Sequence, residues 1–310
     1  MQQTTATAVN RPGGSARAPR SGFWRDYGWA YLFIAVPVLL FLVFTLYPVI
    51  SAFIMSFQEY GVLSSKWIGT GNYSRLMQDD VFWKAMRNTF YFTIGTVPVN
   101  IIITFGLAYL IFQMKTKWQT FFKAALYLPS VASGVTLSLV WLAMFDPTSG
   151  GLFNKVLGLM GLEPVIWLGQ SSTALFSLML MTYLSSHGSG IILYLAAMGG
   201  VPKSLYEAAD IDHASGWTQF TKITWPLLKP TTLYLLVTGV IMSFQVFISV
   251  YLMTQGGPNF ATTTIAYLIY DTAFVYYEFG LASAQSFVLA AMIIIISIVQ
   301  FKYFSTDIEY

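Results

Sequence analysis

The chain has 310 residues, of which 56% are hydrophobic and only 9% are charged, whereas soluble domains carry about 25% charged residues. This composition excludes a soluble globular protein and indicates an integral membrane protein. The formal net charge is +3 and there are no cysteines, which excludes disulfides, thiol nucleophiles and cysteine-ligated metal sites.

Residues 1–25 differ from the rest of the chain, because they are polar and rich in Gly, Pro, Ser and Arg. This composition predicts a disordered tail on the cytoplasmic side. No short apolar stretch with a small-residue cleavage site follows the basic residues, so we do not expect a cleaved signal peptide. Residues 26–310 are predicted to form a transmembrane domain that contains a cytoplasmic loop at 202–230.

Six segments are apolar over the roughly 20 residues that a membrane-spanning helix needs. They predict an all-α integral membrane protein with six transmembrane helices. The expected spans are 29–57, 89–113, 121–145, 174–198, 231–254 and 281–303.

The segment 255–280 is ambiguous. It starts with a Gly-Gly-Pro turn, continues with an apolar stretch, and carries Asp271 and Glu278. We interpret it as an outer loop followed by an interfacial or re-entrant helix. The alternative is a seventh membrane span.

The Lys and Arg residues are distributed unevenly between the two sides of the predicted spans. With the N-terminus inside, only five of the 16 lie on the outer side: Lys66, Arg75, Lys84, Arg87 and Lys155. Cytoplasmic loops of membrane proteins carry an excess of positive charge. We therefore expect a multi-pass protein with a cytoplasmic N-terminus, which places the loop 202–230 in the cytoplasm.

Motifs for covalent chemistry are missing from the sequence. There is no GxxxxGK[ST] phosphate-binding loop, so another subunit must bind ATP if ATP drives this protein. The two histidines, His187 and His213, are too few for a histidine-cluster metal site. We therefore expect no catalytic residues, no bound cofactor and no metal site in this chain.

The longest polar segment in the second half is 207–230, EAADIDHASGWTQFTKITWPLLKP, and apolar spans flank it on both sides. We predict a helix over 204–214 with Ser204 as its N-cap and acidic residues near its start, where the helix dipole favours them. The small side chains of Ala208 and Ala209 allow another surface to approach closely. Phe220 and Trp225, together with Ile223, can insert into a groove of a partner. The alternative is a connector that lies on the membrane surface.

This segment resembles the EAA loop of ABC importer permeases, which docks on the ATPase. It matches that pattern at Glu207, Ala208, Ala209, Ile223 and Pro226, and departs from it at His213, where the family usually has glycine, and at Trp225, where it usually has leucine. If the glycine of the family adopts a positive φ in this turn, His213 at the same position costs of order 1 kcal/mol. Either the turn differs here or that cost is tolerated. The resemblance implies an ATPase-coupling loop made of Glu207, Ala208, Ala209, Asp212, His213, Gly216, Phe220, Ile223 and Pro226.

The rest of the chain resembles the carbohydrate branch of these permeases. The matching fragments include LYPVISAFIMSF at 46–57, YLPSVASGVTLSLVWLAMFDP at 127–147 and MTQGGPNFATTTIAYLIYDTAF at 253–274. The resemblance implies the type I importer fold and half of a translocation path for a sugar in a bacterial or archaeal cell membrane. It also implies the partners: a second homologous permease subunit, two ATP-binding cassette subunits and an extracellular or periplasmic solute-binding protein, with no nucleic acid.

Uncharged polar residues gather in the fourth and fifth predicted spans, where they are costly unless they face the bundle interior or water. Hydroxyl and amide groups beside aromatic rings match a sugar without a fixed charge. The candidate path residues are Thr182, Tyr183, Ser186, Ser189, Gly239, Met242, Ser243 and Gln245. The alternative is that such residues allow tight helix packing, and we expect His187 to be a hydrogen-bonded core or partner-facing histidine.

Two alternatives from other classes stay open at this point. A transporter driven by an ion gradient would need acidic residues within the membrane, and the six predicted spans contain none. An ABC permease for a glycerol phosphate ester or a polyamine would need charged groups along its path.

Overall fold

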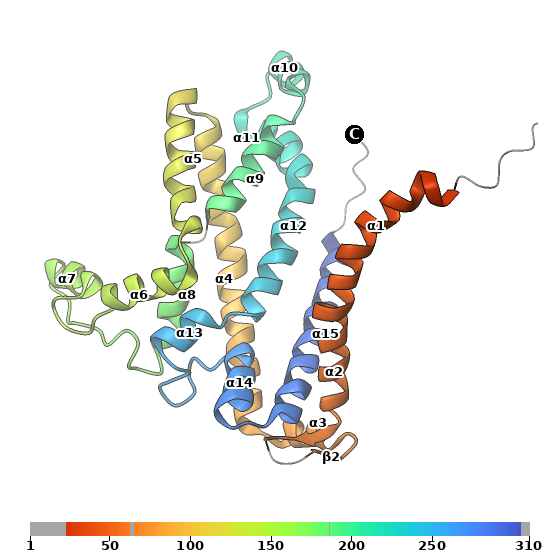
Figure 1. Ribbon diagram of the computed structural model, residues 1–310. Coiled ribbons are helices and arrows are strands. Elements are labelled where there is room, and N and C mark those ends of the chain that lie inside the picture. The colour runs from red at the N-terminus through yellow and green to blue at the C-terminus, as the bar shows by residue number, and fades with distance from the viewer. Residues whose placement is uncertain (1–22, 63–64, 186, 305–310) are drawn as a thin grey trace, which may run out of the picture. The chain divides into compact units, whose positions relative to one another are not determined.

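The computed structural model describes residues 23–62, 65–185 and 187–304 (Figure 1). It divides into two compact units, Met1–Ser51 and Ala52–Tyr310, which are considered separately. The described residues are mainly helical. The only strands among them are β1 (Gln58–Tyr60) and β2 (Ser65–Trp67), which pair in antiparallel register with Gln58 opposite Trp67. Most of the predicted tail lies outside the described residues.

The first membrane-spanning helix is made of three consecutive pieces. These are α1 (Phe23–Phe41), a π-helical turn η1 (Leu42–Leu46) and α2 (Tyr47–Met55). Residues Tyr27–Met55 are long and apolar enough to cross a membrane, which agrees with the span expected at 29–57.

The helix α4 (Asp80–Phe112) follows the short helix α3 (Gly71–Gln78) and begins earlier than the expected residue 89. The carboxylate of Asp79 accepts a hydrogen bond from the backbone N–H of Val81 (2.8 Å) and so caps the helix. An N-cap of this kind stabilises the first turn. The predicted start was wrong because hydropathy marks the apolar part of a helix and not its polar first turns.

The third predicted span, 121–145, is not one straight helix. It is divided into α5 (Thr116–Val131) and α6 (Gly134–Met144), which meet at an angle of 96°. Pro129 lies in the last turn of α5, and the hydroxyl of Ser133 accepts a hydrogen bond from the N–H of Thr136 to begin α6. The short outer helix α7 (Leu152–Leu159) follows.

The fourth span is also a bent pair, of α8 (Ala174–Ser185) and α9 (Gly188–Gly199), with an angle of 44° between them. The first residue of α9, Gly188, is buried against the backbone of α5. Ser186, between the two helices, lies outside the described residues.

The polar segment forms two helices with a turn between them. The first is α10 (Lys203–Ile211), and the second begins at α11 (Gly216–Gln219) and continues through the π-helical turn η2 (Phe220–Thr224) into α12 (Trp225–Phe244). The fifth span therefore starts well before the predicted residue 231. After α12 comes the short α13 (Ile248–Met253).

Three details of the predicted first helix of this segment were wrong. Its N-cap is Pro202 rather than Ser204, and it ends at Ile211, with no acidic residue in its first turn. The second helix has the side-chain N-cap instead: the hydroxyl of Ser215 accepts a hydrogen bond from the backbone N–H of Thr218.

The ambiguous segment contains α14 (Ile265–Tyr270) and the π-helical turn η3 (Asp271–Val275). Together they form a short apolar helix, Ile265–Val275, which is too short for the roughly 20 residues of a span. The last helix is α15 (Phe279–Phe304). The described residues thus contain four continuous candidate spans, and six when each bent pair is one span.

Within the second unit, α4 is the central helix, because it packs against α8, α9, α12 and α14. It contributes to all three hydrophobic clusters: Phe82, Ala85, Met86 and Val97 to the first, Phe92 to the second, and Ala108 and Ile111 to the third. Figure 1 shows α10 and α11 at one end of this unit and α3 and α14 at the other.

We predict that Gly188→Ala destabilises the protein. An alanine Cβ there would lie 2.7 Å from the Cα of Tyr127 and 2.8 Å from the carbonyl oxygen of Leu126, so α5 and α9 would have to move apart. Overpacking of this kind costs roughly 1–3 kcal/mol, and the melting temperature in detergent should fall. The control is Gly158→Ala in α7, where a Cβ would meet nothing within 4 Å; equal melting temperatures for the two variants would contradict the prediction.

Candidate functional site

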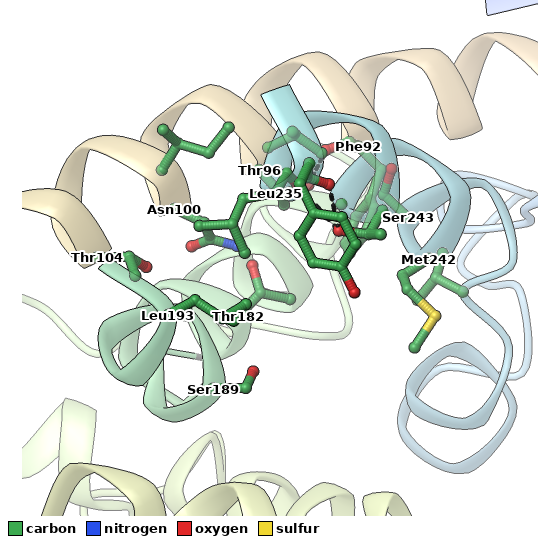
Figure 2. A pocket seen from close by; sticks show the side chains of 17 residues that line it. Phe92, Thr96, Asn100, Thr104, Thr182, Ser189, Leu193, Leu235, Met242 and Ser243 are labelled. Atoms are coloured by element: carbon green, nitrogen blue, oxygen red, sulfur yellow. Dashed lines mark hydrogen bonds between the residues drawn. The ribbon is translucent and has the colours of Figure 1, made fainter. Parts of the chain in front are cut away.

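A cavity of about 520 Å³ lies between α4, α8, α9 and α12 (Figure 2). Its wall mixes hydroxyl and amide groups with apolar side chains. The lining residues are Phe92, Thr96, Val97, Asn100, Ile101, Thr104, Thr182, Ser189, Gly190, Leu193, Tyr234, Leu235, Thr238, Gly239, Met242, Ser243 and Val246. None of these residues is charged.

Most of the hydroxyl groups in the wall donate a hydrogen bond within the protein. Thr96 donates to the carbonyl oxygen of Phe92 (2.6 Å) and Thr182 to that of Met179 (2.8 Å). Ser243 donates to the hydroxyl of Thr93 on α4 (2.9 Å). Because their protons are used in this way, these hydroxyls offer mainly acceptor lone pairs to a molecule in the cavity.

Asn100 is different, because its Oδ1 is buried and has no hydrogen-bond partner in the described chain. Buried polar groups are rarely left unpaired, and each exception requires an explanation. Figure 2 shows the Asn100 amide on the cavity wall, near Thr182 and Leu193. A solute or water molecule in the cavity can supply the partner that the protein does not.

The structure brings together five of the eight candidate path residues, Thr182, Ser189, Gly239, Met242 and Ser243, all of which line this cavity. Their role in transport stays a prediction.

Three candidate path residues do not line the cavity in the described structure. The hydroxyl of Tyr183 donates to the carbonyl oxygen of Gly95 on α4 (2.8 Å), which is a contact between helices. Gln245 is exposed at the C-terminal cap of α12. Ser186 lies outside the described residues.

Sequence reasoning missed the contribution of α4 to the cavity, which comes from Thr96, Asn100 and Thr104 together with apolar neighbours. These three residues are four positions apart along an apolar helix, and this spacing puts polar groups on one helical face. Polar groups on one face of a spanning helix generally point to the bundle interior or to water, so the signal was present. Tyr234 and Thr238 of α12 were missed in the same way.

His187 is buried at the junction of α8 and α9 and is hydrogen-bonded on both ring nitrogens. Its Nε2 lies 2.6 Å from the carbonyl oxygen of Tyr183, so Nε2 carries a proton and donates it. Its Nδ1 lies 2.8 Å from the hydroxyl of Thr104 on α4. The geometry is that of a hydrogen-bonded core histidine, as the sequence predicted, and it connects the bend of the fourth span to a cavity-lining residue of α4.

The polar segment at the far end of the unit presents an exposed surface. Glu207, Ala208, Asp212, His213 and Gly216 are exposed, and Ala209 is half-buried. Two hydrogen bonds connect α10 to the helix that follows: Gln219 Nε2 donates to Asp210 Oδ1 (2.6 Å), and the hydroxyls of Tyr206 and Thr224 lie 3.0 Å apart.

His213 adopts a left-handed backbone conformation, with φ of 52°. It does so between α10 and α11, at the position where the resemblance leads us to expect glycine. The turn therefore keeps the conformation that glycine favours, and the histidine carries the steric cost of its Cβ.

Phe220 and Trp225, which were expected to insert into a partner, make aromatic contacts within the chain, and insertion into a partner stays a prediction. The Phe220 ring packs against Phe105 and Tyr109 of α4, with centroid distances of 5.7 and 5.4 Å, and Trp225 packs against Phe105 at 5.5 Å. These side chains anchor the segment to α4, and Ile223 and Pro226 are half-buried beside them.

The two acidic residues of the segment 255–280, Asp271 and Glu278, lie outside the candidate spans. Glu278 forms an ion pair with Arg75 of α3 (2.8 Å). Asp271 belongs to η3, and partial burial raises the pKa of its carboxyl group. Neither residue lines the cavity.

Residues 100–305 match the family described as "Binding-protein-dependent transport system inner membrane component". The chain is 35% identical to the arabinooligosaccharides transport system permease protein AraP of Bacillus subtilis (strain 168), with 92% of each chain covered. It is 34% identical to the lactose transport system permease protein LacF of Rhizobium radiobacter, over 92% of this chain and 97% of that one.

A solved structure with a similar fold is a chain of a bacterial alginate ABC transporter in complex with an alginate pentasaccharide-bound periplasmic protein. The TM-score is 0.80 and the sequence identity 25%, over 91% of this chain and 96% of that chain.

We predict that His213→Gly raises the melting temperature in detergent, because it removes a Cβ from a left-handed position that costs roughly 1 kcal/mol. The control is His213→Ala, which removes the exposed imidazole and keeps the Cβ. If the alanine variant were stabilised as much as the glycine variant, backbone strain would not be the cause.

Proposed function

The chain belongs to the family of binding-protein-dependent transport system inner membrane components, and we propose that it forms half of the path for a carbohydrate through an ATP-driven importer. It is a multi-pass membrane permease with the type I ABC importer fold. The resemblance seen in the sequence is thereby confirmed.

The observation that carries the carbohydrate proposal is the neutral cavity. Its wall offers hydroxyl and amide groups for sugar hydroxyls, and apolar surface and the Tyr234 ring for the apolar face of a sugar. Small-molecule sites are typically apolar with a few placed polar groups. The names of the relatives support the proposal, because AraP is named for arabinooligosaccharides and LacF for lactose.

The same cavity argues against the two alternatives. A phosphate ester requires a cation in the path and a polyamine requires an anion, but the lining residues include neither. An ion-driven transporter requires an acidic site within the membrane, and Glu278 is paired with Arg75 outside the candidate spans.

In the proposed mechanism, movement enters at the exposed surface of α10 and α11. The helix that begins at α11 continues through η2 into α12, which lines the cavity, and the rings of Phe220 and Trp225 attach its start to α4. A push on α10 would therefore tilt two cavity walls together, as rigid bodies that rock between two states.

The proposed assembly contains a second homologous permease subunit and two ATP-binding cassette subunits, one of which grips the segment 202–230. A solute-binding protein delivers the solute at the opposite end. The alginate transporter was solved with a periplasmic binding protein, which supports this kind of partner. The excess of Lys and Arg on the side of 202–230 supports a cytoplasmic N-terminus.

The proposal is tested by isolating this chain from its native membrane in mild detergent and identifying the accompanying proteins by mass spectrometry. We expect a nucleotide-binding ATPase and a second six-span permease. Isolation of the chain alone, in several detergents that keep it folded, would contradict the proposal.

We predict that Glu207→Lys abolishes solute uptake and uncouples ATP hydrolysis from it, while the protein stays folded in the membrane. Glu207 is exposed on α10, so reversing its charge changes the surface offered to the ATPase. The control is Glu163→Lys, which makes the same charge change on an exposed outer residue. Unchanged uptake by the Glu207 variant would remove the coupling role.

We predict that Asn100→Leu lowers the affinity for the transported sugar by roughly two- to tenfold, because a net hydrogen bond contributes about 0.5–1.5 kcal/mol. The measurement is the concentration dependence of uptake, with Ile102→Leu on the exposed face of the same helix as the control. An unchanged KM in the Asn100 variant would show that the amide does not contact the solute.

A further inference from the structure

A second pocket, of about 500 Å³, lies at the end of the unit opposite α10, between the first turns of α4, the first turns of α8 and the loop before α14. Its lining residues are Lys84, Arg87, Asn88, Tyr91, Ser171, Ser172, Leu175, Phe176, Met179, Asn259 and Ala261. It shares no lining residue with the cavity described above.

Two cations line this pocket and no acidic side chain does. Lys84 is half-buried and donates from Nζ to the carbonyl oxygen of Asn259 (2.5 Å). Arg87 is exposed and forms no hydrogen bond or ion pair within the described chain, in which Arg75–Glu278 is the only ion pair. Ser171 and Ser172 are exposed residues of the same pocket, and the hydroxyl of Ser171 donates to the carbonyl oxygen of Pro258 (3.4 Å). The pocket therefore presents uncompensated positive charge together with hydrogen-bond donors.

One part of the pocket wall is apolar. It consists of the Tyr91 ring and of Leu175, Phe176 and Met179 on α8. From there the exposed face of α4 continues with Ile94 (66% exposed) and then Ile102 (70% exposed).

The spacing along α4 places these groups in one stripe. Lys84, Arg87 and Tyr91, followed by Ile94, are three or four residues apart and therefore share one helical face. Asn100 and the other cavity-lining residues of α4 lie on a different face. The stripe thus changes from cationic at the helix end to apolar toward the middle of the span.

We propose that this pocket binds an anionic phospholipid, with the phosphate between Lys84 and Arg87 and an acyl chain along Tyr91, Ile94 and the apolar wall of α8. Basic side chains at the membrane interface attract anionic headgroups, and Lys and Arg reach the headgroup level from a spanning helix. A neutral sugar would not use the cations. An acidic side chain of another protein would not use the apolar wall, and a phospholipid uses both.

The proposal does not depend on the transported solute or on an ATPase. The proposed orientation enters only in assigning the lipid to the outer leaflet. If the carbohydrate proposal failed, the phospholipid proposal would still stand. If the phospholipid proposal failed, the carbohydrate proposal would still stand.

The experiment uses the full-length protein with the subunits that co-purify, and measures binding of phosphatidylglycerol and phosphatidylcholine of matched acyl chains by native mass spectrometry. We expect at least tenfold tighter binding of phosphatidylglycerol. The variant Lys84→Gln/Arg87→Gln should lose this preference. The control variant Lys66→Gln/Lys155→Gln removes the same charge from exposed outer residues and should keep it.

Arg87→Gln alone provides a second variant, because Arg87 has no partner in the described chain and its loss leaves the Lys84 contact in place. It should weaken phosphatidylglycerol binding at an unchanged melting temperature. Inorganic phosphate at millimolar concentration should not displace the lipid if the acyl chain contributes.

Three results would overturn the proposal. One is equal binding of the two lipids by the unmodified protein. Another is a loss of the preference for phosphatidylglycerol in Lys66→Gln/Lys155→Gln that equals the loss in Lys84→Gln/Arg87→Gln. The third is complete displacement by inorganic phosphate, which would indicate a simple anion site. A pocket covered by a second permease subunit would also give equal lipid binding, and cross-linking from position 87 would identify that subunit.

Discussion

Hydrocarbon offers no hydrogen-bond partners, so every backbone polar group at membrane depth must be paired inside the protein or with water in a cavity. This constraint explains how the chain interrupts its spans. At the break before α6, Ser133 caps the new helix. At the break before α9, His187 donates to the carbonyl oxygen of Tyr183. Between α12 and α13, Thr264 donates to the carbonyl oxygen of Val246 (2.9 Å), a cavity-lining residue. Two of these breaks adjoin the cavity, where irregular backbone is tolerated.

The same arrangement makes the cavity sensitive to movement at a distance. The helix from α11 to α12 has one end at the exposed polar segment and the other at the cavity, and α4 runs alongside it. Aromatic contacts of Phe220 and Trp225 with Phe105 join the two near the polar segment, and the hydrogen bond from Ser243 to Thr93 joins them near the cavity. Two attachments along their length favour movement of the pair as one body.

Much of the fold follows from the sequence, because hydropathy and charge bias are properties of whole segments. The six apolar segments and the polar insert were found in this way. The segment 255–280, interpreted as a loop with an interfacial or re-entrant helix, contains a helix too short for a span. Hydropathy cannot show where a helix bends, because the residues on both sides of the break are equally apolar. The bends near Pro129 and His187 were missed for this reason, as was the continuation of α12 back to Gly216.

The site was only partly predictable. The hydroxyl-bearing residues of the fourth and fifth spans indicated from the sequence that these helices form the cavity. Which of those residues line the cavity depends on how the helices pack, because packing decides which helical face is buried. Tyr183 does not line the cavity, because its hydroxyl donates to the carbonyl oxygen of Gly95 on α4. Asn100 was not among the predicted path residues, and only the structure shows that its Oδ1 is buried without a hydrogen-bond partner.

In the proposed mechanism, the helix from α11 to α12 moves as one rigid piece while the cavity changes shape. The chain contains no cysteine, so pairs of spin labels can be placed in it without background from other positions of this chain. The most direct measurement is the distance between labels at Lys222 and Gln245, at the two ends of this helix, and between labels at Ile192 and Gln245, in the assembled transporter with and without ATP. The account predicts that the first distance stays constant and the second changes. A change in the first with no change in the second would contradict it.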